Sequence, residues 1–532
     1  MTDSSKKQGK IIDVLRQQRE IERQIRELLE LEAQDAIQEK LEQIVTQNDF
    51  DLILVALLGN LGTTDPRFRG ALGLIASRLP PQRIASYLRA AARDRKRTDQ
   101  ERLTAVMILE KYLNEKVEEA TLADLKDPGE VAMQSLREVI AESRRDRTII
   151  LDYIHDLNEQ PIEVVYMILR CLKEMPAESQ VELLRMMAQD ERKEVASQAM
   201  EMLGRNRTAP AGRALQMLRP TISPQLHEAL ERAQRKLTLA GVSIEPLPLP
   251  DSSWRTLVSP IDGGGVQKVL FIQPCSDSKR YRFLSLAISD RFGIVDAEGG
   301  DGVASLQFPE PAPLGTVHTF VLFQYVLSLL LMEADFDYGR RLILRGLQTH
   351  FEKNIPTPLA YRLWNDFIWG YSAETVKTDF QLPRHRSKPD ADYLARSSSL
   401  LDLPAFATWF VQSPLIEEYA ERLFSRVTPH GVDISHAWLA ELTEAHFDNP
   451  EILERFAWRL QTMSEWLLLS GQEEAAHLAL IAGSYLHRIP PSQHPLLLGM
   501  VRGGLIVALF RRNHDEGLAP RQPPDTQMWS NN

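Results

Sequence analysis

Positive charge is concentrated in one stretch of this 532-residue sequence. Its basic side chains are Arg89, Arg93, Arg95, Lys96, Arg97 and Arg102. Guanidinium and ammonium groups bind phosphates, and a single-strand site would add aromatic rings that stack on bases. No aromatic residue lies within this stretch, and the net charge of −11 opposes generic binding to nucleic acid or acidic membranes. We therefore favour a solvated loop between helices and keep a nucleic-acid patch as the alternative.

Acidic residues alternate with glycines in a second stretch. Asp296, Glu298 and Asp301 lie among Gly299, Gly300 and Gly302. Carboxylate oxygens are suitable ligands for hard cations such as Ca²⁺, but this spacing does not match an EF-hand loop. We expect a solvated acidic turn and predict no metal ligand here.

The twelve histidines and two cysteines form no recognisable catalytic or metal-binding pattern. Two pairs of histidines lack further ligands at a suitable spacing: His430 with His436, and His487 with His494. Cys171 and Cys275 are too few for a disulfide framework or a cysteine-based zinc site. Phosphate-loop, dinucleotide-binding, zinc-protease and nucleophile-elbow motifs are also missing from the sequence. We predict no catalytic residue and no cofactor, although these absences do not close the question of enzymatic activity.

Aromatic residues cluster in the last third of the chain. Tyr361, Trp364 and Phe367 follow one another at three-residue steps, which places them on one face of an expected helix. Such a face usually packs into a core, and we favour that interpretation. The alternative is a groove in which these rings bind a peptide or a small ligand.

The elements that would position these residues begin with a repeated helical pattern. A helix-starting residue followed by an apolar helix returns about every thirty residues, as in stacked helical hairpins. The starts are Asp65, Asp99, Asp127, Gln160, Asp190 and Ser223. Asp and Ser side chains can accept a hydrogen bond from the first turn, and proline suits the first helical position. One hairpin cannot bury its own apolar face, so neighbouring hairpins must stack.

Two of these repeats carry motifs of a known family. The D-P-x-x-R start of Asp65, Pro66 and Arg69 resembles a HEAT repeat, as does the V-A-x-x-A-x-x-x-L-G run at 195–204. The resemblance covers residues 48–240 and implies a short-period, armadillo-like α-solenoid. The family contains scaffolds, adaptors, a few lyases and a few DNA-binding members, so the resemblance implies an architecture and no particular activity.

The rest of the chain divides into further segments. Residues 1–47 predict a long helix, which would be either a cap on the first repeat or a dimerising coiled coil. Alternating runs at 266–273 and 282–289 predict a β-hairpin. The apolar run at 317–332 is too short and too polar to span a bilayer, so we expect a buried helix. A glycine at 471 between two apolar helical runs predicts a helical hairpin in the last domain.

The expected division is 1–47 terminal helix, 48–240 repeats, 241–253 proline-rich linker, 254–315 small β module, 316–512 C-terminal helical domain and 513–532 disordered tail.

These observations favour a mainly α-helical protein that acts as a non-catalytic scaffold or adaptor for other proteins. A helical-repeat groove would bind the partner. Nucleic-acid binding through residues 89–102 is one alternative, and a ligand-binding regulator or enzyme with a site between the β module and the C-terminal helices is another. We expect a cytoplasmic protein without a membrane-spanning segment, which could form a homodimer through its N-terminal helix.

Overall fold

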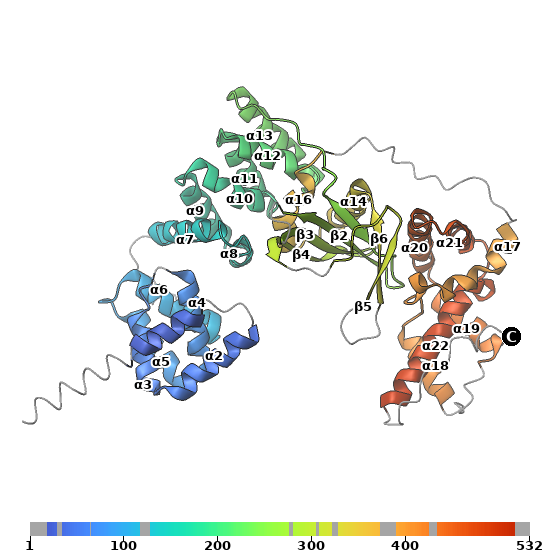
Figure 1. Cartoon of the computed structure of the whole chain (residues 1–532), viewed down its shortest axis with the longest axis horizontal. Helices are drawn as coiled ribbons and strands as arrows, with labels where there is room; N and C mark the ends of the chain where they lie inside the picture. Colours follow the sequence, from blue (N-terminus) through green and yellow to red (C-terminus); the bar gives the residue numbers. More distant parts are fainter. Residues whose placement is uncertain are drawn as a thin grey trace, which may run out of the picture. The chain divides into compact units, whose positions relative to one another are not determined.

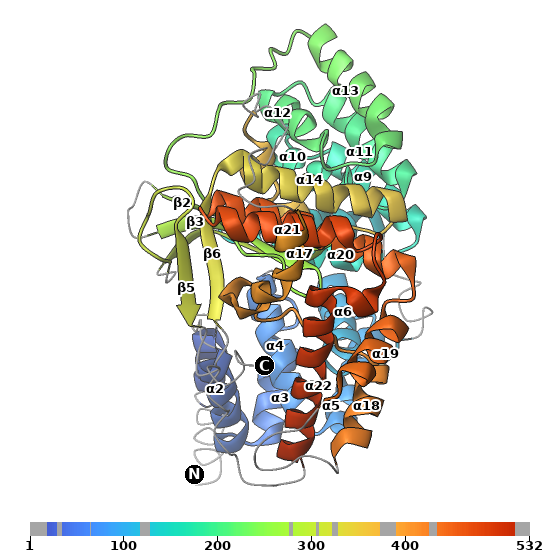
Figure 2. The ribbon, with the colours of Figure 1, turned by 90° about the vertical axis from the view of Figure 1, so that its right-hand side faces the viewer.

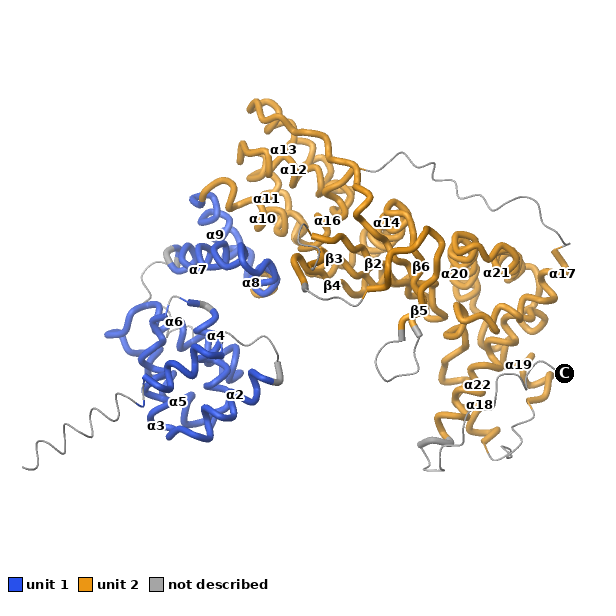
Figure 3. The backbone as a smooth tube through the Cα atoms, viewed as in Figure 1, with its two compact units in different colours: residues 1–153, 160–175 blue, residues 154–159, 176–532 orange. Residues whose placement is uncertain are grey.

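The computed structural model describes residues 17, 19–28, 34–63, 65–117, 128–275, 280–304, 308–321, 328–372, 390–424 and 434–515. It is mainly helical, with an antiparallel six-stranded sheet in the middle of the chain and helices after it (Figure 1). The chain forms two compact units (Figure 3). Unit 1 contains residues 1–153 and 160–175, and unit 2 contains residues 154–159 and 176–532. Within the described ranges, no helix is both long and apolar enough to cross a membrane.

Unit 1 is helical, and one apolar core joins its helices between residues 21 and 109. Residues 19–28 are helical, and they are followed by α2 (Gln34–Gln47), α3 (Phe50–Gly59), α4 (Pro66–Arg78), α5 (Pro81–Arg93), α6 (Asp99–Met107), a π-helix (Ile108–Tyr112), α7 (Pro128–Ser143), α8 (Ile149–Asn158) and α9 (Ile162–Lys173). The end of α8 belongs to unit 2. Gly73 of α4 lies directly under the Tyr112 ring, where any larger side chain would clash, so this glycine lets α4 approach the π-helix closely.

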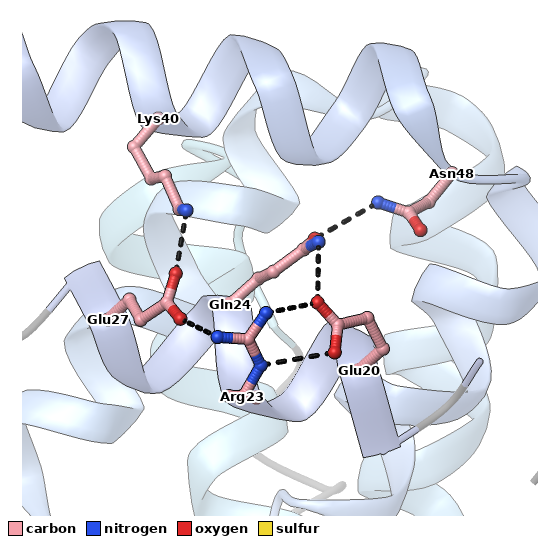
Figure 4. Close-up of polar contacts among 6 residues, drawn as sticks. All are labelled: Glu20, Arg23, Gln24, Glu27, Lys40 and Asn48. Carbon is pink, nitrogen blue, oxygen red and sulfur yellow. Dashed lines mark hydrogen bonds and ion pairs between the residues drawn. The ribbon is translucent and has the colours of Figure 1, made fainter. Parts of the chain in front are cut away.

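The prediction of one long N-terminal helix is wrong for the described part of that segment. Lys40 Nζ donates to Glu27 Oε2 over 2.7 Å, and Asn48 Nδ2 donates to Gln24 Oε1 over 3.2 Å (Figure 4). In one straight helix, Glu27 and Lys40 would be separated by about 20 Å along the axis. The helix at 19–28 and α2 therefore lie side by side.

The apolar residues of these two helices do not form an exposed dimer seam. They are buried in the core of unit 1: Ile21, Ile25, Leu28, Leu41 and Ile44. Asn60 at the end of α3 donates to Glu22, and the Arg26 guanidinium stacks over the Phe68 ring at 4.7 Å. Both helices thus pack on the first predicted repeat. Residues 1–16, which contain the rest of the expected seam, lie outside the described residues.

The expected helix starts differ in how well local chemistry sets them. Asp65 caps α4 as predicted: it accepts hydrogen bonds from the backbone of Arg67 and Phe68. At the second expected start, Asp99, the observed N-cap is the preceding residue, Thr98. Thr98 forms a capping box with Glu101. Asp190 does not cap a helix. It binds the backbone and side chain of Arg192 instead, and the next helix begins at Lys193.

Unit 2 begins with helices and continues into the sheet. The helices are α10 (Ala177–Met187), α11 (Lys193–Arg205), α12 (Ala209–Leu218), a 3₁₀ turn (Pro224–Leu226) and α13 (His227–Leu239). The strands are β1 (Arg255–Val258), β2 (Val266–Pro274), β3 (Arg280–Ser289), β4 (Gly293–Ala304), β5 (Val317–Val321) and β6 (Ser328–Ala334). Their order is β4-β3-β2-β1-β6-β5, with antiparallel neighbours throughout. The hairpin predicted at 266–273 and 282–289 is confirmed by the β2–β3 pairing.

Two predictions in and after the β module are wrong. The run expected to form a buried helix at 317–332 contains β5 and most of β6, which pair with each other and join the sheet through β1. The expected acidic turn is part of β4, where Asp296 and Glu298 are exposed. Gly299 of this strand lies against the Trp364 ring, and a side chain at this position would clash with it. Gly299 therefore allows close packing of β4 against α15.

Helices follow the sheet and cover one of its faces. α14 (Phe336–Lys353) packs on β1 to β4, and α15 (Leu359–Trp364) packs on β4. After α16 (Asp366–Trp369) come α17 (Asp390–Ala395), 3₁₀ turns (Ser397–Asp402 and Pro404–Phe406), α18 (Pro414–Phe424), α19 (His436–His446), α20 (Pro450–Leu469), α21 (Glu473–Tyr485), a 3₁₀ turn (Pro491–Gln493) and α22 (Pro495–Asp515). In Figure 2, α20 and α21 lie side by side, and Arg341 and Arg345 of α14 pair with Glu465 of α20.

The predicted hairpin around Gly471 is confirmed. Gly471 adopts a φ of 78°, a left-handed conformation that a side chain disfavours, and it ends α20 before α21 begins. Residues 243–250 of the proline-rich linker have no helix or strand. His430 and the tail from 516 onward lie outside the described residues.

Candidate functional site

The basic stretch of unit 1 does not present its cations as one surface. Arg102 is buried, and its Nε donates to the carbonyl of Ala92 over 2.8 Å. Arg97 Nη1 donates to the carbonyl of Leu58 over 3.1 Å and lies 3.2 Å from Glu101 Oε1. Both guanidinium groups therefore hold α3, α5 and α6 together, and neither is directed at a ligand.

The remaining cations of the stretch are closer to solvent. Arg89 forms an ion pair with Glu115. Arg93, Arg95 and Lys96 are exposed. The exposed part of the stretch therefore consists of the Arg93, Arg95 and Lys96 side chains.

The aromatic residues singled out from the sequence are buried in unit 2. Tyr361, Trp364 and Phe367 are 0%, 3% and 4% exposed, so their rings pack in the core. The break between α15 and α16 separates the first two from the third. Burial raises the pKa of Tyr361, and its hydroxyl accepts a hydrogen bond from Trp369 Nε1 over 2.9 Å. These rings offer no surface to a ligand, but they fix the helix that carries Arg362.

A cavity of 440 Å³ lies beside this helix, and every residue that lines it belongs to unit 2. It is bordered by the end of α8, the turn before α11, the start of β4, and the loop between α14 and α15. The lining residues are His155, Asn158, Glu191, Phe292, Ile294, Val295, His350, Ile355, Pro356, Thr357, Pro358, Leu359 and Arg362. A second cavity of 110 Å³ shares Glu191, His350 and Arg362 with the first. The size of the larger cavity suits a bound side chain or small ligand.

Arg362 is the charged group at the junction of these two cavities. Its side chain is 3% exposed, and its Nε donates to Thr357 Oγ1 over 3.1 Å. The nearest carboxylate oxygen, Glu191 Oε1, lies 3.7 Å from Arg362 Nη2, which is longer than a hydrogen bond. Burial lowers the pKa of Arg362, because desolvation penalises its charged form, yet an arginine stays protonated at neutral pH. The site therefore contains a buried cation with a distant counter-ion.

A network from α10 holds the backbone around Arg362 in place. Arg185 is 1% exposed and donates to the carbonyls of Arg362 and Leu363 over 2.9 and 2.6 Å, and to Asn365 Oδ1 over 2.7 Å. Asn365 in turn donates to Gln189 Oε1 over 2.7 Å. These bonds join the helices before the sheet to those after it. Within unit 2, the cavity thus has rigid walls.

His350 in the cavity wall is a structural residue. The Ile294 amide donates to its Nε2 over 2.8 Å, so its Nδ1 carries the proton and donates to the Ile355 carbonyl over 3.0 Å. Burial lowers the pKa of His350, which keeps the ring neutral. Because both ring nitrogens are occupied, His350 is not available for proton transfer to a substrate.

Apolar side chains form the rim of the larger cavity. Phe292 in the β3–β4 turn and Val295 in β4 are 53% and 45% exposed, so two apolar side chains meet solvent at the same rim. The guanidinium of Arg291 and the ammonium of Lys353 lie 5.7 and 5.9 Å from the centre of the Phe292 ring. The rim therefore combines an exposed aromatic ring with two cations.

A third cavity, of 490 Å³, lies between α11 and α13. Polar and charged residues line most of it, and the Lys236 ammonium is 2.9 Å from Glu201 Oε1. No group of three or more metal-ligating side chains occurs in the described part of the chain. The cavity at Arg362 is therefore the better candidate for a binding site, because it combines apolar surface with a buried charge.

Sequence reasoning did not find this site. Arg362 stands alone in the aromatic run Y-R-L-W, and an arginine within an apolar helix is the one signal that could have indicated it. Phe292 lies in the β3–β4 turn and Val295 in β4, and neither residue type stands out in the sequence. No family model, no curated protein and no solved structure matches this chain.

Proposed function

We propose that this protein is a non-catalytic scaffold or adaptor that binds a segment of a protein partner in the cavity beside Arg362. The observation that carries the proposal is the exposed apolar rim formed by Phe292 and Val295 around a 440 Å³ cavity. Exposed apolar side chains at a concave site are typical of surfaces that bind other proteins. Arg362 would give such a site a specific polar contact.

The proposal includes a HEAT-like arrangement of the helices before the sheet. α7 packs against α9, α10 against α12, and α11 against α13. In each pair, a helix contacts the next helix but one along the chain, which is the pattern that stacked helical hairpins produce. The scaffold would carry the binding cavity at the end of these helices, and the low cysteine content of the sequence agrees with the cytoplasmic location that we propose.

Partner capture with matched variants tests this function. The full chain, a Phe292→Asp variant and a Leu239→Asp variant are immobilised and exposed to nuclease-treated lysate of the native host. Leu239 is 88% exposed on α13 and serves as the control, because it does not line the cavity. We expect one protein partner to bind the unchanged chain and the control variant but not Phe292→Asp. Equal capture by all three chains would contradict the proposal.

A small molecule is a second candidate occupant, because the cavity volume lies within the range of known ligand sites. A protein that binds a metabolite there would be a regulator. Its melting temperature should then rise with one compound of a metabolite library, and this rise should be lost in Phe292→Asp. If no compound shifts the melting temperature, this second function is rejected.

Nucleic-acid binding through the basic stretch stays an alternative with its own test. Binding of a labelled oligonucleotide at low salt, with a steep decrease as salt rises, is expected only if the exposed cations contact phosphates. The triple variant Arg95→Ala, Lys96→Ala, Arg97→Ala should then reduce the salt dependence. Since Arg97 holds the fold, Arg93→Ala with Lys96→Ala is the companion variant that removes exposed cations only.

A further inference from the structure

We infer that the partner segment bound in this cavity carries an acidic side chain next to an apolar one, and that Glu191 occupies the acidic position when no partner is bound. This inference rests on the proposed function and adds the chemistry of the partner. The acidic group would pair with Arg362, and the apolar group would pack against Phe292 and Val295.

The geometry of the Arg362–Glu191 pair points to an exchangeable carboxylate. Arg362 is almost fully buried, whereas the Glu191 side chain is 59% exposed. The separation of 3.7 Å allows electrostatic attraction but not a direct hydrogen bond. A carboxylate that entered the cavity could approach to hydrogen-bond distance and form the planar, two-bond contact that guanidinium groups favour. Glu191, being exposed, could move into solvent at little cost.

Two other carboxylates near Glu191 have partners other than Arg362. Asp190, its neighbour, is occupied by Arg192 through two side-chain contacts of 2.9 Å. His155 on the cavity wall is 3.7 Å from Glu159, an exposed carboxylate outside the cavity. Glu191 is therefore the carboxylate that a ligand would have to replace.

Charge at the rim also favours an acidic occupant. Arg291 and Lys353 flank Phe292, and the Lys353 ammonium donates to the Arg291 carbonyl over 2.6 Å, which holds both cations near the ring. A segment crossing the rim would thus pass two cations before its acidic group reached Arg362. Apolar contacts at Phe292, Val295 and Pro356 would supply affinity, while the cations would select against basic segments.

A random nonapeptide display library selected on the full chain tests this inference. We expect the selected peptides to contain Asp or Glu beside an aromatic or aliphatic residue. Synthesis of the best peptide with Asn or Gln at its acidic position should weaken binding about tenfold, because a charge-assisted contact is lost. Glu191→Gln should tighten binding of the acidic peptide about threefold, since it removes the competing carboxylate. Phe292→Asp should abolish enrichment, and Leu239→Asp should leave it unchanged.

These readouts separate the inference from the proposed function. Glu191 is exposed, so its substitution leaves folding intact, and a melting curve verifies this for each variant. Selected peptides that lack acidic residues, or that bind Glu191→Gln no more tightly, would overturn the inference. If a cellular partner is still captured through the rim in that case, the scaffold function stands and only the acidic contact fails. If capture of the partner does not depend on Phe292, the proposed function itself is contradicted, and the inference that rests on it falls with it.

Discussion

The basic stretch of unit 1 and the cavity of unit 2 both depend on arginines, but these arginines have different surroundings. In the stretch, Arg102 and Arg97 donate to main-chain carbonyls inside their own helical unit. At the cavity, it is Arg185 that donates to main-chain carbonyls. The Arg362 guanidinium borders the cavity, and the Glu191 carboxylate lies 3.7 Å from it. Two members of the dense cation run therefore hold the fold of unit 1, while a single arginine in an apolar helix borders a cavity. The number of charges in a sequence window is a poor guide to where a charge is available.

The largest expected effect comes from removing the arginine that holds the cavity wall. Arg185→Met should destabilise unit 2 by about 3–5 kcal/mol, because two carbonyls and Asn365 lose a buried charged donor. All eight tryptophans of the chain lie in unit 2, so denaturant unfolding followed by tryptophan fluorescence reports on this unit alone.

The matched control for this change is Arg205→Met on α11. Arg205 is exposed and pairs with Glu201 over 2.7 Å, so its loss should have little effect. Similar midpoints for the two variants would mean that the Arg185 network does not stabilise the wall.

The second prediction concerns the basic stretch itself. Arg102→Ala should lower the local stability of α5 and α6 by about 1–3 kcal/mol, since the Ala92 carbonyl loses its buried donor. Hydrogen exchange of peptides from residues 81–107, read by mass spectrometry, measures this change. Lys96→Ala is the control, and its exposed side chain predicts an effect within about 0.5 kcal/mol. Equal effects at both positions would remove the distinction between structural and exposed cations.

The third prediction concerns pH at the cavity. Burial holds the pKa of His350 below its ordinary value of 6.5, so the unfolded chain binds the proton more readily than the folded chain. Its contribution to stability is therefore complete above pH 6.5 and is lost as the pH falls below that value, with a slope of at most about 1.4 kcal/mol per pH unit for one proton. Unfolding of unit 2 at several pH values between 8 and 5 should show this loss.

His350→Gln should flatten this pH dependence in part. It should not abolish it, because burial also lowers the pKa of His446 and of His494. His155→Gln, at an exposed position of the same cavity, is the control. An unchanged pH profile in His350→Gln would show that folding does not lower the pKa of His350.

The smallest expected effect lies at the surface of unit 1. Arg23 pairs with Glu20 and Glu27, and the hydrogen bond from Lys40 helps to hold the pKa of Glu27 below its usual range (Figure 4). Because these groups are solvated, Arg23→Gln should change the exchange rates of α2 only slightly. That change should vanish at about 1 M salt, where the Debye length is about 3 Å. A large, salt-independent effect would show that this surface network holds the two helices together.

The sequence predicted those parts of the fold that depend on neighbours along the chain. Asp65 starts α4 because its carboxylate reaches amides two and three residues away, and Gly471 ends α20 because its own φ is left-handed. The alternation at 266–289 gave the β2–β3 hairpin for the same reason. The run at 317–332 was misassigned, because apolar residues without alternation fit a buried helix and a buried strand equally well. Pairing of β6 with β1 made this run part of the sheet.

By itself, then, the sequence determined the helix cap at Asp65, the two hairpins with short connections, and a mainly helical chain with strands in its middle. The tertiary structure alone decided that the N-terminal segment folds back on itself, that Tyr361 is buried and that Arg362 borders a cavity. These features arise from contacts between residues far apart in the chain, such as Arg185 with Asn365 and His350 with Ile294. Local periodicity does not indicate which distant carbonyl will accept a hydrogen bond from a given side chain. That pairing decides whether an arginine holds the backbone, as Arg185 does, or borders a cavity, as Arg362 does.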